Sequence, residues 1–278
     1  MNGNMREWFA FIKMVIKQPW IIVVHHPYYQ LCQRSSKEQF QKQMVQYLEE
    51  TERLSQFQCG FRKQHSTQDA VTYFTDCIRK GIDKGCFTGV AFIDMRKVFD
   101  SVNHLLLLEK LGKLGIIEHE QRWFSHYLSN RKQSVLYEMV LSEPEEIRSR
   151  VPQESILGSI LFSLYINDIK ASLGKSQVLL YADDAVIHYR SDDIQELKLV
   201  LQGNITNPLA WSVANRLSIH PVKTEAVLFG THQKTSKVDK FELFLGESLV
   251  KQVDHYKYLD ILIDAYLNFK EHTAKGFG

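Results

Sequence analysis

Residues 177–189 read Gln-Val-Leu-Leu-Tyr-Ala-Asp-Asp-Ala-Val-Ile-His-Tyr, so two apolar stretches flank a short acidic break. Short apolar runs joined by a few turn-forming residues are typical of a β-hairpin. The spacing predicts strands over 177–181 and 185–189, with Asp183 and Asp184 at the tip. An ordinary turn is the alternative interpretation, because aspartate favours turns whether or not a site lies there.

A third aspartate follows another apolar stretch. Residues 89–93 (Gly-Val-Ala-Phe-Ile) predict a buried strand that ends at Asp94. Carboxylates beside a core need a counter-charge, and magnesium supplies one while leaving room for substrate phosphates. Adjacent residues of an extended chain point to opposite faces, so we expect Asp183 to be the metal partner of Asp94 and Asp184 to be a weaker or outer ligand.

Helical patterns fill most of the remaining chain. Apolar residues at helical spacing predict helices over 35–56, 66–82, 98–111, from Ser155 onward, and about 192–215. The inner face of the third helix is expected to carry Val98, Val102, Leu105, Leu108 and Leu111. Further strands are expected at 226–229, and as a pair at 241–250 and 256–263. Helices alternating with a hairpin-rich sheet indicate an α+β fold.

Composition narrows the class of protein only slightly. The 278 residues are 44% hydrophobic and 24% charged, with a net charge of +2, which is ordinary for a globular protein. The four cysteines form no C-x-x-C pair, so zinc binding and a secreted disulfide framework are not expected. Polar residues and Pro19 interrupt the apolar stretch at 8–24, so no membrane segment is expected. An intracellular location is expected, in either the nucleus or the cytoplasm.

Six motifs follow one another between about 57 and 264. They are Gln58-Cys-Gly-Phe-Arg62, Phe92-Ile-Asp94 with Phe99-Asp100, Val151-Pro-Gln153 with Tyr165-Ile-Asn-Asp168, Tyr181-Ala-Asp-Asp184, Lys223-Thr-Glu225, and Tyr256-Lys-Tyr-Leu259. In kind and order these motifs resemble those of the reverse transcriptases of non-LTR (LINE-like, jockey-like) retrotransposons. The resemblance implies the fingers and palm of a right-hand polymerase, with an antiparallel palm sheet packed on helices. The expected organisation is a partial fingers segment at 1–55, the fingers-palm core at 56–264 and the start of a thumb or connection at 265–278, with the thumb itself essentially missing.

The resemblance also implies an activity and its partners. The activity is RNA-directed DNA polymerisation, in which two Mg²⁺ ions, or Mn²⁺, assist transfer of deoxynucleotides from their triphosphates to the 3′-hydroxyl of a DNA primer on an RNA template. Asp94, Asp183 and Asp184 would hold the metals. An endonuclease domain would originally have preceded this region and a thumb would have followed it.

Other motif residues acquire roles by the same resemblance. Arg62 would contact the triphosphate, Phe99 would exclude the ribose 2′-hydroxyl, and Gln153 would lie near nucleotide and template. Lys223 would donate a proton to pyrophosphate or contact a phosphate. Tyr256, Lys257 and Tyr258 would contact the primer, although a plain strand whose aromatic residues face a core explains the two tyrosines nearly as well.

Several positions depart from the family pattern. Glu154 and Asp260 stand where the family has glycine, Ser159 replaces a proline, and Arg150 replaces a glycine. A glutamate beside substrate phosphates adds bulk and repulsion. These departures favour an alternative hypothesis, a catalytically inactive nucleic-acid-binding remnant of a polymerase. A group II intron maturase or telomerase-like relative is a third reading, and the wording of the Ser155–Asp168 segment argues against it.

Overall fold

The computed structural model describes residues 39, 41–60, 62, 65–96, 98–129, 132–134, 136–137, 140–146, 151, 156–269 and 273. The chain forms two compact units that interleave along the sequence. One comprises Met1–Leu54 and Phe99–Tyr165, and the other Ser55–Val98 and Ile166–Gly278. We call them the helical unit and the sheet unit. The expected domain boundaries after residues 55 and 264 stay predictions.

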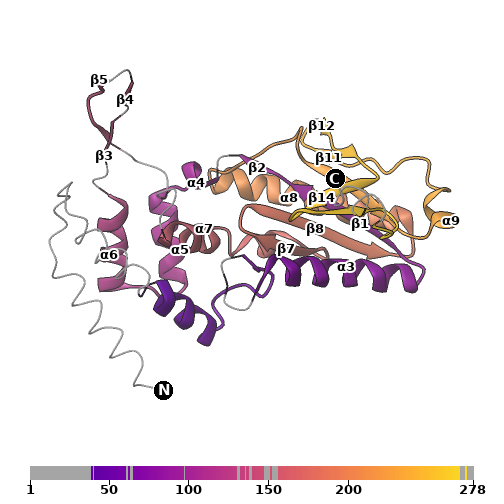
Figure 1. Cartoon of the computed structure of the whole chain (residues 1–278), viewed down its shortest axis with the longest axis horizontal. Coiled ribbons are helices and arrows are strands. Elements are labelled where there is room, and N and C mark those ends of the chain that lie inside the picture. Colours follow the sequence, from indigo (N-terminus) through magenta and orange to yellow (C-terminus); the bar gives the residue numbers. More distant parts are fainter. Residues whose placement is uncertain are drawn as a thin grey trace. The chain divides into compact units, whose positions relative to one another are not determined.

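A five-stranded sheet organises the sheet unit, with strand order β13-β10-β1-β8-β7 (Figure 1). Its central strand β1, Phe87–Ile93, pairs antiparallel with both β8, Asp184–Ser191, and β10, Glu225–Phe229. The edges are β7, Gln177–Tyr181, and β13, Lys251–Gln252, which runs parallel to β10. All seven residues of β1 are buried, as expected for a strand covered on both faces.

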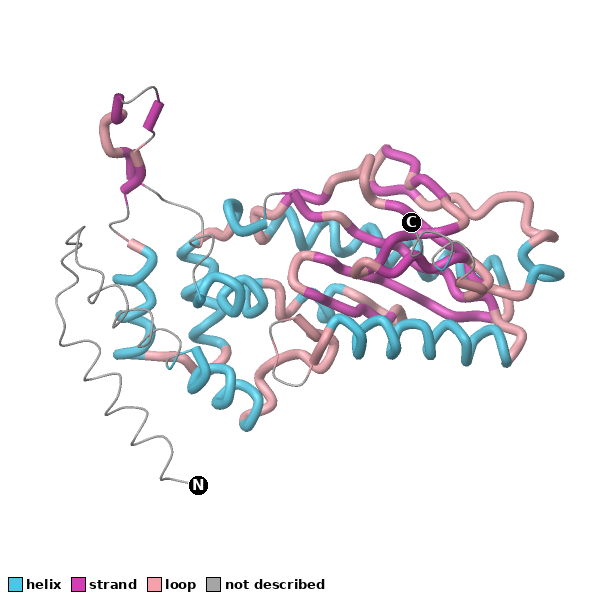
Figure 2. Tube along the Cα trace, in the orientation of Figure 1, coloured by secondary structure: helices cyan, strands magenta, loops and turns pink. Residues whose placement is uncertain are grey.

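Two long helices pack on opposite faces of this sheet, and both are visible in Figure 2. The helix α3, Thr67–Asp83, packs Phe74 and Ile78 against Val90 and Phe92 of β1. Gly89, the β1 residue before Val90, faces Leu197 and Leu201 of the other helix, α8, Ile194–Ala214. Alternation along β1 therefore divides the core into two layers.

Local capping accounts for where these helices begin. Ser66 and Asp69 form a reciprocal capping box at the start of α3, in which each side chain accepts a hydrogen bond from the other's backbone N–H. Asp193 caps α8 by accepting hydrogen bonds from the N–H groups of Gln195 and Glu196. The predictions of helices at 66–82 and 192–215 are confirmed.

The other strands after α8, besides β10 and β13, are short. They are β9 (Ser218–Ile219, paired with β2, Met95–Arg96), the hairpin of β11 (Phe244–Leu245) and β12 (Ser248–Leu249), and the hairpin of β14 (His255–Tyr258) and β15 (Ile261–Asp264). The expected pairing of 241–250 with 256–263 is wrong, because each run closes a tight hairpin of its own. A 3-10 turn, Ile169–Ser172, and the short helix α9, His232–Thr235, complete this unit.

The helical unit contains helical residues 41–50 and the helices α4 (Val98–Ser101), α5 (His104–Lys113), α6 (Glu118–Leu128) and α7 (Ile156–Tyr165). Two small hairpins, β3–β6 and β4–β5, use Lys132–Gln133 with Glu145–Glu146 and Leu136–Tyr137 with Val140–Leu141. Ser155, where the helix α7 was expected to begin, lies outside the described residues.

One prediction about helix faces is wrong in this unit. Asn103 starts a new helix by capping the N–H of Leu106, so the expected helix at 98–111 is broken. The break shifts the helical phase, and Leu105 is 77% exposed whereas Leu107 is fully buried. Val98, Val102 and Leu111 are buried as expected. Gly112 lies inside α5, and Gly115, with φ +84°, follows its end.

The α+β assignment and the antiparallel sheet packed on helices are confirmed. No helix among the described residues is long and apolar enough to cross a membrane.

Candidate active site

The acidic hairpin tip lies at the end of β7 and β8 as expected. Tyr181 pairs with Asp184, and Ala182 and Asp183 form the two-residue loop between them. Ala182 has φ +55°, a left-handed conformation that favours glycine, while Asp183 stays at negative φ. Strain of this kind persists only where the surrounding structure holds the backbone in place.

The segment 57–60 holds this loop from one side. Cys59 N–H donates to the Leu180 carbonyl at 2.8 Å, and Leu180 N–H donates to the Phe57 carbonyl at 2.8 Å. Gly60 then passes so close to the loop that an added Cβ would stand 2.4 Å from Ala182 N. Only glycine fits there, which gives the glycine of the Gln58-Cys-Gly motif a physical reason.

Asp94 lies on the neighbouring strand at the same end of the sheet. The register between β1 and β8 ends at the pair Ile93–Ala185, so Asp94 and Asp184 are the next residue on each strand. Asp94 itself interrupts the strand, and its carbonyl accepts a hydrogen bond from His220 N–H at 2.7 Å. The structure therefore brings the strand end at Asp94 to the acidic hairpin tip.

The carboxyl groups of these three acids interact electrostatically. Burial, together with the neighbouring carboxylates of Asp183 and Asp94, raises the pKa of Asp184 to about 6. The Asp184 side chain still reaches solvent, so its desolvation is partial. A carboxyl group whose pKa is raised in this way indicates a local excess of negative charge, which a bound cation would offset.

The acids do not form a closed metal cage. Within the described part of the chain, no three His, Cys, Asp or Glu side chains lie close enough together to hold one ion. The donor set nevertheless fits magnesium, which binds through one or two carboxylates and completes its shell with water and substrate phosphates. Asp94, Asp183 and Asp184 are the residues that could hold it.

Tyr256 and Glu225 extend the site beyond the three aspartates. The Tyr256 ring stacks on Phe92 with centroids 3.7 Å apart and planes 10° apart. Burial raises the pKa of Tyr256 to about 12, with further contributions from Asp184, Glu225 and Asp94. Glu225 pairs in register with Phe92 and forms an ion pair with Lys251 at 2.7 Å.

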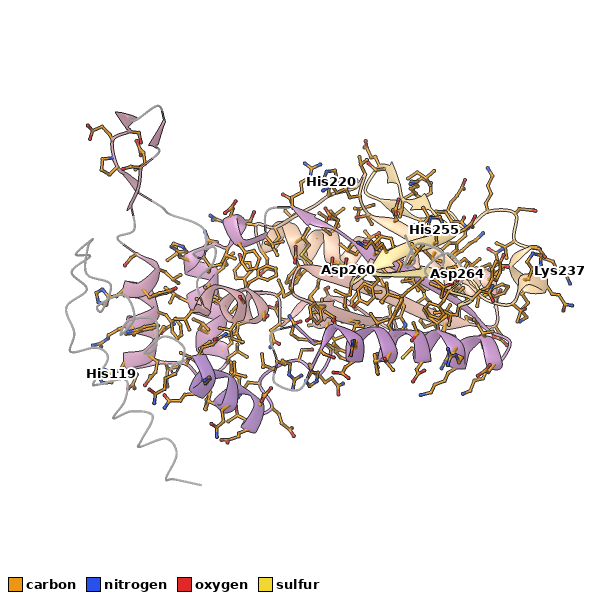
Figure 3. The ribbon with its side chains drawn as sticks, viewed as in Figure 1. His119, His220, Lys237, His255, Asp260 and Asp264 are labelled. Atoms are coloured by element: carbon orange, nitrogen blue, oxygen red, sulfur yellow. The ribbon has the colours of Figure 1, made fainter. Side chains whose placement is uncertain are left out.

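Of the expected primer contacts, only two reach the surface. Lys257 is exposed, and its ammonium group lies 2.8 Å from Asp260 across the tip of the β14–β15 hairpin, where Figure 3 labels Asp260. Tyr258 is only 1% exposed and packs against Phe74 with ring centroids 5.4 Å apart. Tyr258 is therefore a core residue, in agreement with the alternative interpretation of a plain strand whose aromatic residues face a core.

The remaining candidates are more dispersed. Arg62 donates from Nη1 to the carbonyl oxygens of Gln58 and Ser55, at 3.3 and 3.4 Å, so it braces the segment that supports the acidic loop. Lys223 is exposed in a turn that follows β9. Phe99 belongs to the helical unit, where its ring lies 5.1 Å from Phe162. Gln153 and Glu154 lie outside the described residues.

Two motif residues have structural partners that the sequence did not indicate. The Asn167 side chain accepts a hydrogen bond from Ser55 N–H at 2.7 Å, and Asp168 accepts one from Trp211 Nε1 at 3.1 Å. The sequence also did not indicate that Glu225 lies near the site. A carboxylate at one end of an apolar strand was the available signal, since Glu225 begins β10 just as Asp94 follows β1.

Comparison with known proteins identifies the class to which this site belongs. The family described as reverse transcriptase (RNA-dependent DNA polymerase) matches residues 30–263, and the chain belongs to this family. The chain is 31% identical over 232 residues to the probable RNA-directed DNA polymerase from transposon BS of Drosophila melanogaster, covering 79% of this chain and 25% of that protein. It is 29% identical to the RNA-directed DNA polymerase from mobile element jockey of Drosophila funebris, covering 81% and 25%.

The resemblance to jockey-like retrotransposon polymerases is therefore confirmed. This chain spans about a quarter of the length of these relatives. Among solved structures, apo telomerase from Candida tropicalis gives a TM-score of 0.55 at 12% identity, covering 85% of this chain and 44% of that one. Telomerase from Candida albicans gives 0.51 at 14% identity, covering 84% and 38%. At these identities the likeness concerns the fold alone.

Proposed function

We propose that this chain catalyses RNA-directed DNA synthesis as part of retrotransposition. The observation that carries the proposal is the meeting of Asp94 with Asp183 and Asp184 at one end of the central sheet, in a member of the reverse transcriptase family. The substrates would be an RNA template, a DNA primer and deoxynucleoside triphosphates.

The carboxylates would act by holding Mg²⁺, with Asp94 and Asp183 as principal ligands and Asp184 beside them. Two bound ions, or Mn²⁺ in their place, would lower the barrier for in-line attack and stabilise the leaving oxygen. In that reaction the primer 3′-oxygen would bond to the α-phosphorus, the bond to pyrophosphate would break, and the hydroxyl proton would pass to water. The raised pKa of Asp184 supports this arrangement, because an uncompensated acidic cluster favours cation binding.

Positively charged and aromatic residues would position the substrates. Arg62 would contact the triphosphate and Lys223 would protonate or contact the departing pyrophosphate. Phe99 would exclude the ribose 2′-hydroxyl and Gln153 would lie near nucleotide and template. Tyr256, stacked on Phe92 near the acids, and Lys257 on the hairpin would contact the primer, whereas Tyr258 would support that hairpin from the core.

A second candidate function is nucleic-acid binding without catalysis. The β14–β15 hairpin supports the loss of catalysis, because Leu259 and Asp260 both have positive φ, +46° and +67°, where the family places glycine at the second position. The Asp260 carboxylate also neutralises Lys257 at 2.8 Å, which weakens the attraction of that lysine for primer phosphates. The positive φ of both loop residues matches a type I′ turn, in which glycine is preferred.

Primer extension on an RNA template with Mg²⁺ separates these two functions. We expect extension by the natural sequence and its loss in Asp183→Asn, with Asp239→Asn as a control that removes an exposed acid outside the site. Extension only after Glu154→Gly or Asp260→Gly would indicate a disabled enzyme. Binding of primer and template without extension in any variant would indicate the inactive remnant.

A further inference from the structure

A cavity lies in the sheet unit, away from the acids. Its volume is about 360 Å³, within the range of small-ligand sites. Its lining comes from α3, β1, β7, β8 and the turn before β7, and comprises Tyr73, Cys77, Lys80, Thr88, Lys175, Gln177, His188, Tyr189 and Arg190. Thr88 precedes Asp94 by six residues on β1, so roughly 20 Å of strand separates the cavity from the acidic tip.

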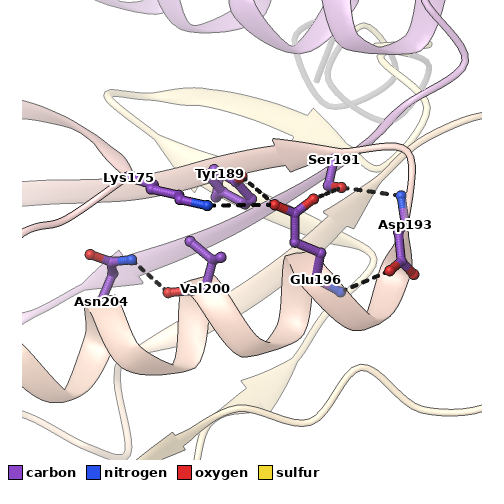
Figure 4. A network of polar contacts seen from close by, with 7 residues as sticks. All are labelled: Lys175, Tyr189, Ser191, Asp193, Glu196, Val200 and Asn204. Atoms are coloured by element: carbon purple, nitrogen blue, oxygen red, sulfur yellow. Dashed lines mark hydrogen bonds and ion pairs between the residues drawn. The ribbon is translucent and has the colours of Figure 1, made fainter.

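The charged side chains of the cavity are all basic. Lys80, Lys175 and Arg190 contribute three cations, and none of the described lining residues is acidic. Glu196 of α8 provides a counter-charge: its Oε1 lies 3.9 Å from Lys175 Nζ and accepts a hydrogen bond from the Tyr189 hydroxyl (Figure 4). Glu196 is itself held by Ser191, so it offsets Lys175 and leaves Lys80 and Arg190 as the main cations.

The inner wall offers polar groups. Thr88 is 1% exposed, and its buried Oγ1 has no hydrogen-bond partner among the described residues. An unpartnered buried hydroxyl is unfavourable in an empty cavity and favourable beside an acceptor. Gly81 leaves the space next to it open, since a Cβ there would stand 2.6 Å from Thr88 Oγ1.

Histidine adds a neutral hydrogen-bonding ring. His188 is 7% exposed, and burial, together with Arg190 and Lys170, lowers its pKa to about 4. At neutral pH the imidazole is therefore uncharged and presents one donor and one acceptor. At the rim, Tyr73 is 52% exposed, so an aromatic ring is available for stacking.

We propose that this cavity binds the phosphate of a nucleotide, either a free mononucleotide or one residue of a nucleic-acid strand. Lys80 and Arg190 would pair with the phosphate, the Thr88 hydroxyl would donate to one of its oxygens, and Tyr73 would stack on the base. The site is independent of the acidic tip and of the polymerase activity, because it needs neither a metal nor the carboxylates.

Calorimetric titration of the whole chain in EDTA tests this site without contribution from bound metal. The probes are 5′-AMP, adenosine and a 12-nucleotide oligoribonucleotide. We expect saturable binding of AMP, no binding of adenosine, and displacement of AMP by inorganic phosphate. Lys80→Gln and Arg190→Gln should each weaken binding about fivefold, as expected for loss of a charge-assisted contact at a partly exposed site.

Two further variants separate the site from general charge and from folding. Thr88→Val keeps the side-chain shape and removes an unpartnered hydroxyl, so it should lower affinity without lowering stability. Lys237→Gln removes one exposed cation from the α9 region and should leave affinity unchanged. Oligonucleotide binding that weakens in the cavity variants, without AMP binding, would assign the site to strand phosphates. Equal affinities of all variants for both probes, or equal binding of adenosine and AMP, would overturn the proposal.

Discussion

Replacing Gly60 with alanine should damage the acidic loop from outside the site. The added Cβ would stand 2.4 Å from Ala182 N, 3.2 Å from the Tyr181 carbonyl carbon and 3.3 Å from Ala182 Cα. All three atoms are backbone, so no flexible side chain can move aside, and the segment 57–60 is tied to Leu180 by two hydrogen bonds. We expect a loss of roughly 1–3 kcal/mol in the free energy of unfolding, the usual effect of overpacking.

Urea denaturation followed by circular dichroism measures this loss, and Gly203→Ala provides a matched control. Gly203 lies in α8 with no atom within 4 Å of an added Cβ, so alanine there should stabilise the helix by about 0.5–1 kcal/mol. If polymerase activity is present, Gly60→Ala should reduce it more than its stability loss explains, because the displaced loop carries Asp183. Equal stability of Gly60→Ala and the natural sequence would refute the close approach.

Three other predictions concern titratable side chains. Protonation of His188 is disfavoured in the fold, so the free energy of unfolding should fall by on the order of 2 kcal/mol as the pH drops from about 6.5 to about 4. His188→Phe should flatten this pH dependence in urea melts. Asp184 contributes a pH dependence of opposite sign, because its raised pKa lowers stability as the pH rises from about 4 to about 6. In EDTA at pH 8, Asp184→Asn should therefore raise the free energy of unfolding by about 1 kcal/mol, after allowance for solvent screening. Tyr258→Phe removes a buried hydroxyl without a described partner, so thermal melts should show unchanged or slightly raised stability, and a large loss would mean that the hydroxyl is bonded.

The periodicity of the sequence predicted the elements that carry the site. The strands at 87–93, 177–181 and 184–191, and the capped helices α3 and α8, are close to their expected positions. These segments are long and strongly patterned, and both helices begin at side chains that can cap them. Local sequence signals were therefore sufficient to predict these strands and helices.

Features that depend on tertiary register were not predictable in the same way. The break at Asn103 changed which leucines of α5 are buried, and the last strands form separate hairpins where one long pairing was expected. Alternation along an extended chain separates Asp183 from Asp184, but only the β1–β8 register reveals that Asp94 and Asp184 end neighbouring strands. The approach of Gly60 to Ala182 and the position of Glu225 likewise arise from contacts between distant segments.

Binding of Mn²⁺ by the acidic tip tests the central claim most directly. Titration of the natural sequence with Mn²⁺, read by the electron paramagnetic resonance signal of the free ion, should show bound metal. Asp94→Asn should bind at least about tenfold more weakly, because even outer partners of metal ligands change affinity by that much. Asp239→Asn, an exposed acid elsewhere in the same unit, should bind like the natural sequence. Equal Mn²⁺ affinity in all three proteins would contradict the assignment of Asp94, Asp183 and Asp184 as a metal site.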